Sequence, residues 1–410
     1  MLCSGEMLKT LAMVTVFAIV ASSSDFQRLP TIRRFDNRPV TANQISTAAV
    51  RMMDEADVKG LAMAVIENGR VVFQQSWGRR SVEKNLPLQI DTVMYGASLT
   101  KLAFAYMVMQ LVDEGRLDLD RPIAQYLPKP LPEYEFYESL KHDDRWRKLT
   151  PRILLSHSSG LANFAFLEPD QLMRLHFEPG SRYAYSGEGI ILLQFVLETG
   201  LGLNVGDEMQ RRVFDRFGMT RTSMSWRADF VDNVADGYAI DGSMRPHARR
   251  SRPRAAGSMD TTITDFARFF ARFSAGEGLS AIARAEMVKP HVAITAPTQF
   301  PTFAEADSPA MRAIGLSAGL GLIAFQAPNG RGFFKGGHDD VTANQALCVR
   351  GGRRCVLYLS NDVRAESVFQ RLTEAPLGGS AMPWSWEGYV PYRRGSTSHT
   401  PTPEWFQGGL

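Results

Sequence analysis

The chain has 410 residues, of which 44% are hydrophobic and 22% charged, with a formal net charge of +3 at pH 7. These values are ordinary for a globular protein of one large domain or two modest ones. The small basic excess gives no general case for nucleic-acid binding, and no nucleic-acid partner is expected. One local exception is residues 245–254, which hold five arginines. This stretch is either a solvated loop or a rim that attracts anionic substrates or envelope polymers.

Residues 1–24 have the pattern of an export signal. Lys9 precedes an apolar stretch over residues 11–21, and small residues follow as ASSS. The stretch is shorter than the roughly 20 apolar residues that span a bilayer. The expected location is therefore the periplasm or the exterior. The alternative is that the signal is not cleaved, and an uncleaved signal is the only membrane attachment that we expect. Residues 25–44 form a lead-in to the main domain.

Two β-rich runs follow within residues 61–78, joined by Asn68-Gly69. Asn-Gly favours a tight hairpin turn, because both turn positions need a positive φ. The next feature is SLTK at residues 98–101, which opens an apolar run that ends at Gly115. Since this run is apolar nearly all round, it predicts a buried central helix. A second S-x-x-K, at residues 81–84, precedes the polar NLPLQ and is interpreted as a surface loop.

The signals from residue 116 to 254 are mostly helical, and those after residue 255 are a helix and then strands. The strand candidates are GLGLIAFQ, GRGFFKGG, NQALCVR and RCVLYLS, followed by a helix near residues 365–375. Strands at both ends of the chain therefore flank a helical middle. That order predicts an α/β (α+β) domain over residues 45–375, with one sheet built from both chain ends and a helical region packed beside it. Residues 376–410, rich in Pro, Gly and Trp, are interpreted as a wrapping or loosely ordered tail.

Cys348 and Cys355 lie in a predicted hairpin that turns on Gly351-Gly352. Pairing across the turn places the two cysteines opposite each other. A cross-strand disulfide is geometrically possible in an oxidising compartment. Two buried thiols are the alternative.

The placement of Ser98 and Lys101 has a chemical consequence. At the start of a helix the two side chains lie on one face, and the helix N-terminus favours negative charge on the serine oxygen. Burial beside the apolar run disfavours the charged amine, so the pKa of Lys101 moves towards that of a usable general base. This is the arrangement of Ser–Lys acyl transfer. A capping serine with a lysine that extends to solvent remains the structural alternative for this motif alone.

Three further segments recur in a fixed order after SLTK: LLSHSSGL at 154–161, PGSRYAYSGEG at 179–189 and FFKGGH at 333–338. In order and spacing, the chain resembles the serine β-lactamase and penicillin-binding-protein superfamily over roughly residues 45–375. The resemblance is strongest to the class C β-lactamase branch with its D-peptidases and esterases. It implies a β-lactamase/transpeptidase-like fold, with an antiparallel sheet, a helical region and the site between them.

Residue by residue, the resemblance implies that Ser98 is the acylated nucleophile and Lys101 its base. It implies that Tyr185 relays a proton to the leaving group and that Lys335 is the cation beside it that attracts a substrate carboxylate. The backbone N–H groups of Ser98 and His338 are the expected oxyanion donors. Gly187, Gly336 and Gly337 are expected to lie along the substrate.

Two residues depart from that pattern. The β-lactamase motif Tyr-x-Asn is Tyr185-Ser186-Gly187 here, and Lys-Thr/Ser-Gly is Lys335-Gly336-Gly337. The carboxamide and the hydroxyl that contact a β-lactam are thus missing. We therefore expect a secreted serine hydrolase that acts through an acyl-enzyme on an ester, amide or β-lactam, with simple esters or D-amino-acid amides preferred. A penicillin-binding D-alanyl peptidase and a slowly deacylating binding or sensor protein are the alternatives.

The remaining polar candidates have structural interpretations. His157 is expected to order a loop, and Glu188 is either structural or a helper in deacylation. The run from His338 to Asp340 reads as a strand end and turn, with a metal site as the minor alternative. No cofactor or metal is expected, the expected partner is a small-molecule, peptide or ester substrate, and the sequence does not indicate the oligomeric state.

Overall fold

The computed structural model describes residues 31–388, so the proposed signal and most of the tail lie outside the described residues. A nine-stranded sheet dominates this part, in the order β10-β11-β12-β13-β14-β15-β3-β4-β5, with every neighbouring pair antiparallel. Its strands are β3 (Gly60–Glu67), β4 (Arg70–Ser81), β5 (Leu86–Pro87), β10 (Val292–Ala293), β11 (Ser317–Ala318), β12 (Ile323–Ala327), β13 (Gly330–His338), β14 (Ala343–Val349) and β15 (Arg354–Ser360). The pairing of β15 with β3 joins the two ends of the chain, which confirms the predicted fold class.

Three short strand pairs, nine α-helices and several short 3₁₀ and π-helical segments complete the described elements. The pairs are β1 (Thr31–Arg33) with β2 (Pro39–Thr41), β6 (Met94–Tyr95) with β9 (Asp260–Thr261), and β7 (Gly237–Tyr238) with β8 (Met244–Arg245). The helices are α1 (Ala42–Ala56), α2 (Leu99–Asp113), α3 (Pro151–Leu155), α4 (Gly187–Leu201), α5 (Val205–Met209), α6 (Ile263–Ala275), α7 (Ala281–Val288), α8 (Pro309–Ala313) and α9 (Glu366–Leu377). Residues 31–44, predicted as a lead-in, thus contribute a hairpin and the start of α1.

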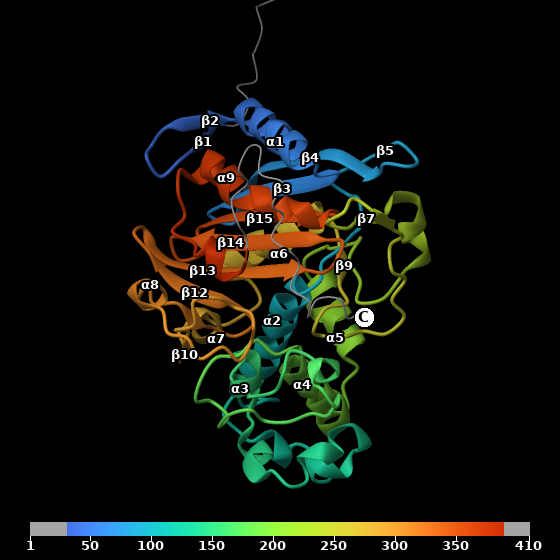
Figure 1. The fold of residues 1–410 in the computed structure, drawn as a ribbon, viewed down its shortest axis with the longest axis vertical. Coiled ribbons are helices and arrows are strands. Elements are labelled where there is room, and N and C mark those ends of the chain that lie inside the picture. Colours follow the sequence, from blue (N-terminus) through green and yellow to red (C-terminus); the bar gives the residue numbers. More distant parts are fainter. Residues whose placement is uncertain (1–30, 389–410) are drawn as a thin grey trace, which may run out of the picture.

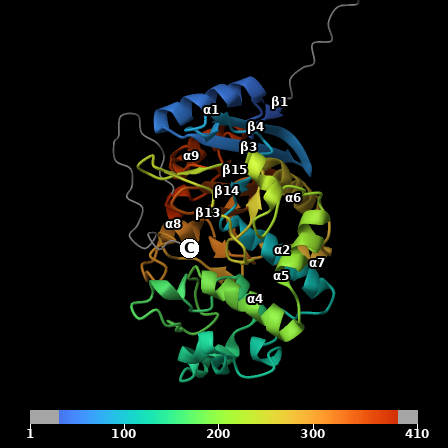
Figure 2. The same cartoon turned by 90° about the vertical axis from the view of Figure 1, so that its right-hand side faces the viewer.

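Helices cover both faces of the sheet, and the side chains of β3 show how. Leu61, Met63 and Val65 belong to one apolar core with α1 and α9. Ala62 and Ala64 point the other way, into a second core with α2 and α6. Alternate residues of a strand face opposite sides, so a strand that is apolar at every position needs cover on both. Figures 1 and 2 show α1 at one end of the molecule and the helices α3 and α4 at the other, with the sheet between them.

The central helix α2 has the ends that the sequence predicts. All but its last two residues are buried, and Gly115, just beyond it, has φ +68°. The turn between β3 and β4 has positive φ at both Asn68 (48°) and Gly69 (76°), as an Asn-Gly hairpin requires. Both local predictions are confirmed.

Cys348 and Cys355 face each other in the register of β14 and β15, and a disulfide joins them. Arg350, Gly351 and Gly352 at the turn all have positive φ. Between residues 31 and 388, no single helix has the length and apolar character of a membrane span. Only α4 together with the segment Val205–Asp215, bent by 102°, reaches that length and composition.

Candidate active site

Ser98 is placed at the N-terminus of α2 by a tight turn. The preceding Ala97 has φ 46°, in the left-handed region that costs a residue with a side chain of order 1 kcal/mol. Thr100 holds this turn, because its Oγ1 donates a hydrogen bond to the Ala97 carbonyl at 2.6 Å. Ser98 itself is half-buried. Its position is set by the turn at Ala97, which the Thr100 hydrogen bond stabilises.

Lys101 lies one turn into α2, directly behind Ser98. Its Nζ is 2.9 Å from the Ser98 Oγ and 2.5 Å from the Ala256 carbonyl oxygen, and only 1% of the residue is exposed. Burial lowers the pKa of Lys101, and the positive charge of Lys335 lowers it further. A shift in this direction favours the neutral amine, which can accept the proton of the Ser98 hydroxyl.

Tyr185 and Lys335 approach from two other elements. Tyr185 comes just before α4, and Lys335 lies near the end of β13. The Lys335 Nζ is 3.4 Å from the Tyr185 hydroxyl. The ammonium groups of Lys101 and Lys335 each lie 5.1 Å from the centre of the tyrosine ring. The structure thus brings together the four residues that the sequence predicts, from three separate segments.

His157 supports the tyrosine and does not reach the cavity. It is 2% exposed, with φ 52°, and its ring centre lies 4.5 Å from that of Tyr185. Its Nδ1 lies 3.2 Å from the Ser186 nitrogen and 3.1 Å from the Ser186 carbonyl oxygen, and burial together with the two lysines holds the pKa of His157 far below its usual range. A neutral imidazole is therefore packed against Tyr185, which agrees with the predicted structural role.

The end of β13 forms an open edge beside Ser98. β12 pairs with β13 only as far as Phe334, so within residues 31–388 no strand pairs with residues 335–338 on that side. A Cβ at Gly337 would lie 2.7 Å from the Leu99 nitrogen and 3.1 Å from the Ser98 nitrogen. Only a glycine allows this contact, which places the strand edge against the first turn of α2. The N–H groups of Ser98 and His338 as oxyanion donors stay a prediction.

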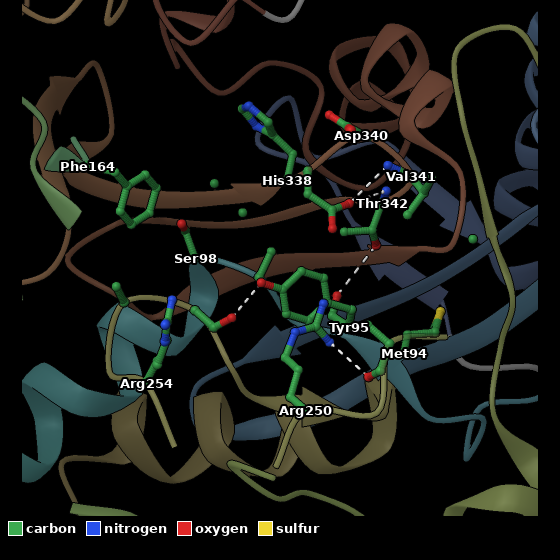
Figure 3. A pocket seen from close by; sticks show the side chains of 18 of the residues that line it. Met94, Tyr95, Ser98, Phe164, Arg250, Arg254, His338, Asp340, Val341 and Thr342 are labelled. Carbon is green, nitrogen blue, oxygen red and sulfur yellow. Dashed lines mark hydrogen bonds between the residues drawn. The ribbon is translucent and has the colours of Figure 1, made fainter. Parts of the chain in front are cut away.

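These elements enclose a cavity of about 370 Å³ that contains Ser98, Tyr185 and Lys335. One wall is apolar and comes from the loop after α3 together with residue 300, namely Phe164, Phe166, Leu167 and Phe300. Figure 3 shows Ser98 between Phe164 and His338, with Arg250 and Arg254 on the side of the cavity away from His338. Ser98 thus faces a pocket with one apolar side and one basic side.

The basic side is the arginine-rich stretch, and its position favours the rim over the solvated loop. Arg245, Arg250 and Arg254 line the cavity. Arg245 pairs with Asp340 at 3.0 Å, and the Arg250 guanidinium lies 3.5 Å from the buried Asp260. Two of the three arginines that line the cavity therefore have a carboxylate partner, and only the partner of Arg250 is buried.

The comparisons with known proteins agree with this geometry. The family model described as Beta-lactamase matches residues 45–377. The chain belongs to the Beta-lactamase family. Its members are serine hydrolases, and this chain is one of them.

Among relatives, lovastatin esterase of Penicillium rubens is 28% identical over 270 residues, which cover 55% of this chain and 67% of the esterase. The structure is similar to D-alanine carboxypeptidase AmpC from Burkholderia cenocepacia, with a TM-score of 0.64 at 17% identity, covering 82% of this chain and 98% of that one. It is also similar to the octameric penicillin-binding protein homologue from Pyrococcus abyssi, with a TM-score of 0.63 at 21% identity, covering 78% and 74%. These two likenesses concern the fold.

One expectation for this Beta-lactamase family member needs correction, and one departure from the family motif has a steric reason. Ser81 itself ends β4 and is 2% exposed, whereas residues 82–85 form an exposed turn as predicted, and neither Ser81 nor Lys84 lines the cavity. Packing at Gly187 also leaves no room for the side chain that the β-lactamase motif carries there. A Cβ at this position would lie 2.7 Å from the Phe164 ring and 2.8 Å from the Asn163 carbonyl oxygen. Asparagine cannot simply be restored at residue 187.

Glu188 is not among the residues that line the cavity. Its Oε1 accepts the Ala165 N–H at 2.9 Å, and burial raises its pKa. It therefore orders the loop that carries the phenylalanine wall, in agreement with its structural alternative. The segment from His338 is a strand end and turn, because Asp339 Oδ1 accepts the N–H groups of Val341 and Thr342. Within residues 31–388, no three His, Cys, Asp or Glu side chains form a cluster that could hold a metal.

Asn163 and Glu387 are two polar cavity residues that the sequence did not predict. Asn163 accepts the Gly187 N–H on its Oδ1 at 3.0 Å and lines the cavity, so a carboxamide is present beside the tyrosine motif, from another loop. Glu387 lines the cavity from the segment after α9. No motif marks either residue, and only the tryptophans next to Glu387 indicate that its segment packs against the domain.

Proposed function

We propose that the protein hydrolyses its substrate through an acyl-enzyme on Ser98. The observation that carries this proposal is the 2.9 Å contact between the Ser98 Oγ and the buried Lys101 amine, at the wall of the cavity. A buried amine whose pKa is lowered can remove the serine proton at a pH where a solvated lysine cannot. No metal or cofactor is needed for this step.

The proposed reaction has an acylation step and a deacylation step, and the same proton carriers serve both. Lys101 takes the proton from Ser98 while the serine oxygen attacks the substrate carbonyl, and the oxyanion is held at the junction of α2 and β13. The bond to the leaving group breaks, and Tyr185 protonates that group and regains its proton from Lys101. Water then attacks the acyl carbonyl and passes one proton through Tyr185 and Lys101 to the Ser98 Oγ as the Oγ–acyl bond breaks, which releases the acid and free Ser98. The three side chains that pass the proton lie side by side in the structure.

The preferred substrate is proposed to be an ester with an apolar acyl group, ahead of penicillins and cephalosporins. The absence of side chains at Gly187 and Gly336 removes two groups that would hold a β-lactam, and the bond from a hydroxyl at position 336 to the substrate carboxylate would alone be worth about 10- to 150-fold in affinity. The wall of Phe164, Phe166 and Phe300 offers apolar surface to an acyl chain. A D-amino-acid amide is the second candidate, because the Asn163 carboxamide can contact an amide.

Export is part of the proposal. The disulfide between Cys348 and Cys355 suits an oxidising compartment. N-terminal sequencing of protein from the culture medium or periplasm should show loss of roughly the first 24 residues, as export signals of this length imply. A mature protein that retains residues 1–24 would contradict cleavage.

Labelling with a fluorophosphonate probe tests the nucleophile. The wild type is expected to be labelled and to hydrolyse short nitrophenyl esters, and Ser98→Ala is expected to lose both. Ser81→Ala is the matched control, a serine of the second S-x-x-K away from the cavity. Labelling that persists in Ser98→Ala would show that Ser98 is not the nucleophile. Burst kinetics separate an enzyme from a sensor, because a protein that stays acylated shows one turnover and then stops.

A further inference from the structure

The segment after α9 reaches the cavity and is firmly anchored there. Trp386 is 1% exposed, and its ring packs 5.9 Å from that of Tyr183 and 6.1 Å from that of Phe334. Its backbone carbonyl accepts the Gln299 N–H at 2.8 Å. These contacts fix the position of the next residue, Glu387.

The Glu387 carboxylate lies against the strand that carries Lys335. It is 8% exposed, and its Oε2 accepts a hydrogen bond from the Gln345 amide at 2.5 Å. Gln345 is the cross-strand partner of Gly336, the residue after Lys335. Glu387 lines the same cavity as Ser98 and Lys335. The carboxylate is thus held by a hydrogen bond in a polar part of the cavity wall. This part differs in chemical character from the aromatic wall.

Lys335 and Glu387 compensate each other's charge. Burial lowers the pKa of Lys335, and the charge of Glu387 opposes that shift. Burial raises the pKa of Glu387, and the charge of Lys335 opposes it in turn, helped by the Gln345 amide and the Gly336 N–H. The neighbouring Glu366 faces His338 instead, with its Oε1 3.3 Å from the His338 Nδ1. The Lys335 amine and the Glu387 carboxylate therefore share one cavity and interact electrostatically within it.

An ammonium and a backbone N–H beside a nucleophile would otherwise recruit an anionic group of the substrate. We propose that Glu387 is a specificity-determining residue that fills this anion site, so that substrates bringing a carboxylate to Lys335 are excluded and uncharged ones are accepted. An anionic substrate must either displace a hydrogen-bonded carboxylate or place two like charges together. A substrate with an uncharged acyl group meets neither cost. The proposal rests on the proposed function in taking this cavity as the substrate site.

Two esters of nearly equal shape measure the effect: 4-nitrophenyl butyrate, which is neutral, and mono-4-nitrophenyl succinate, which carries a carboxylate. For the wild type, kcat/KM is expected to be lower for the succinate. Glu387→Gln keeps the shape and one acceptor for Gln345 while it removes the charge. This variant should raise the succinate-to-butyrate ratio of kcat/KM by at least about tenfold, the worth of one hydrogen bond to a charged group.

Glu374→Gln is the matched control, since Glu374 lies exposed on α9 and not in the cavity. It should leave the ratio within about twofold of the wild type, the limit usual for surface substitutions. If Glu387→Gln also leaves the ratio within about twofold while both esters are hydrolysed, the specificity role is overturned and the hydrolase function stands.

A binding measurement separates this inference from the chemistry. In Ser98→Ala protein, calorimetry compares N-acetyl-D-alanine with its uncharged amide, with and without Glu387→Gln. The substitution should tighten binding of the acid by about tenfold or more and change binding of the amide by less than about twofold. If the substitution tightens binding of the acid but the wild-type protein hydrolyses none of the substrates, the role of Glu387 is upheld and the proposed reaction is rejected. No gain for the acid would overturn the role of Glu387.

Discussion

The two ends of the cavity differ in how closely they keep to the family pattern. At the bond-making end, Ser98, Lys101 and Tyr185 have the residue types, spacing and contacts of a Ser–Lys acyl transferase. At the substrate-binding end, Gly187 and Gly336 lack the side chains of a β-lactamase, and Glu387 supplies a carboxylate instead. The residues of the proposed bond-making step thus keep the types found in the family, while the residues proposed to contact the substrate differ.

The reason lies in how many constraints each end satisfies. Lys101 must be buried, must contact Ser98 and must sit near a proton carrier, so few residue types fit. The substrate-binding end only has to be complementary to one ligand, and loops can meet that need in many ways. Asn163, from the loop after α3, illustrates this freedom.

The largest effect is expected from removing the base. Lys101→Met keeps the length and apolar contacts of the side chain but cannot accept the Ser98 proton. We expect kcat to fall by about 10²- to 10⁴-fold, the usual range for general base catalysis. Single-turnover acylation with a nitrophenyl ester measures it. Acylation within tenfold of the wild type would show that another group takes the proton.

Gly187→Asn should damage the enzyme rather than create a β-lactamase. The new Cβ would meet Phe164 and the Asn163 carbonyl oxygen at less than 3 Å, so the loop that forms the apolar wall must move. We expect esterase activity to fall by about tenfold or more and the protein to lose about 1–3 kcal/mol of stability, as overpacking usually costs. Thermal unfolding and the two assays test this. A variant with intact esterase activity and new penicillinase activity would contradict the steric account.

His157→Ala tests the support of Tyr185. Loss of the ring that packs on Tyr185 and contacts the Ser186 backbone should lower kcat by about fivefold to tenfold, which corresponds to roughly 1 kcal/mol. KM should change by less than about twofold, since His157 is absent from the cavity wall. His157→Asn should recover part of kcat, because asparagine tolerates the positive φ and keeps a side chain that can donate or accept a hydrogen bond. Equal loss in both variants would argue against the positioning role.

The pH profile reports the charge state of Lys101. The base must be unprotonated, so kcat/KM for a neutral ester should rise with pH through the Lys101 pKa. Burial lowers that pKa, and the midpoint should lie below 10.5. Lys335→Met removes a positive charge that also lowers the Lys101 pKa, so the midpoint should move to higher pH in that variant. A midpoint that stays in place or moves to lower pH would show that the rise of kcat/KM with pH does not report the ionisation of Lys101.

The smallest effect on activity is expected from the disulfide. Replacing Cys348 and Cys355 with alanine should cost about 2–3 kcal/mol in the free energy of unfolding, from a loop closed over seven positions. Neither residue lines the cavity, so kcat/KM should stay within about twofold. Denaturant unfolding with parallel ester assays checks both. A large loss of activity in a folded variant would show that the disulfide hairpin influences the geometry of the site.

The sequence predicted the features that depend on local patterns. The turn at Asn68-Gly69, the buried helix from Ser98 and the facing cysteines follow from turn chemistry, apolar composition and strand register. The catalytic segments were found through their order and spacing. Local patterns carry no information on which distant segments meet, and Asn163 and Glu387 enter the cavity only through tertiary contacts. The burial of Ser81 was missed for the same reason, since Tyr238 and its neighbours close over the end of β4.

The most direct test of the central claim compares wild-type kcat/KM for 4-nitrophenyl butyrate with that for nitrocefin and benzylpenicillin. Intact bond-making residues combined with missing β-lactam contacts predict Ser98-dependent ester hydrolysis that exceeds hydrolysis of either β-lactam by at least about tenfold, the lower value for one lost charged hydrogen bond. Efficient cephalosporin hydrolysis with negligible esterase activity would contradict the claim that the substrate-binding end has changed its specificity.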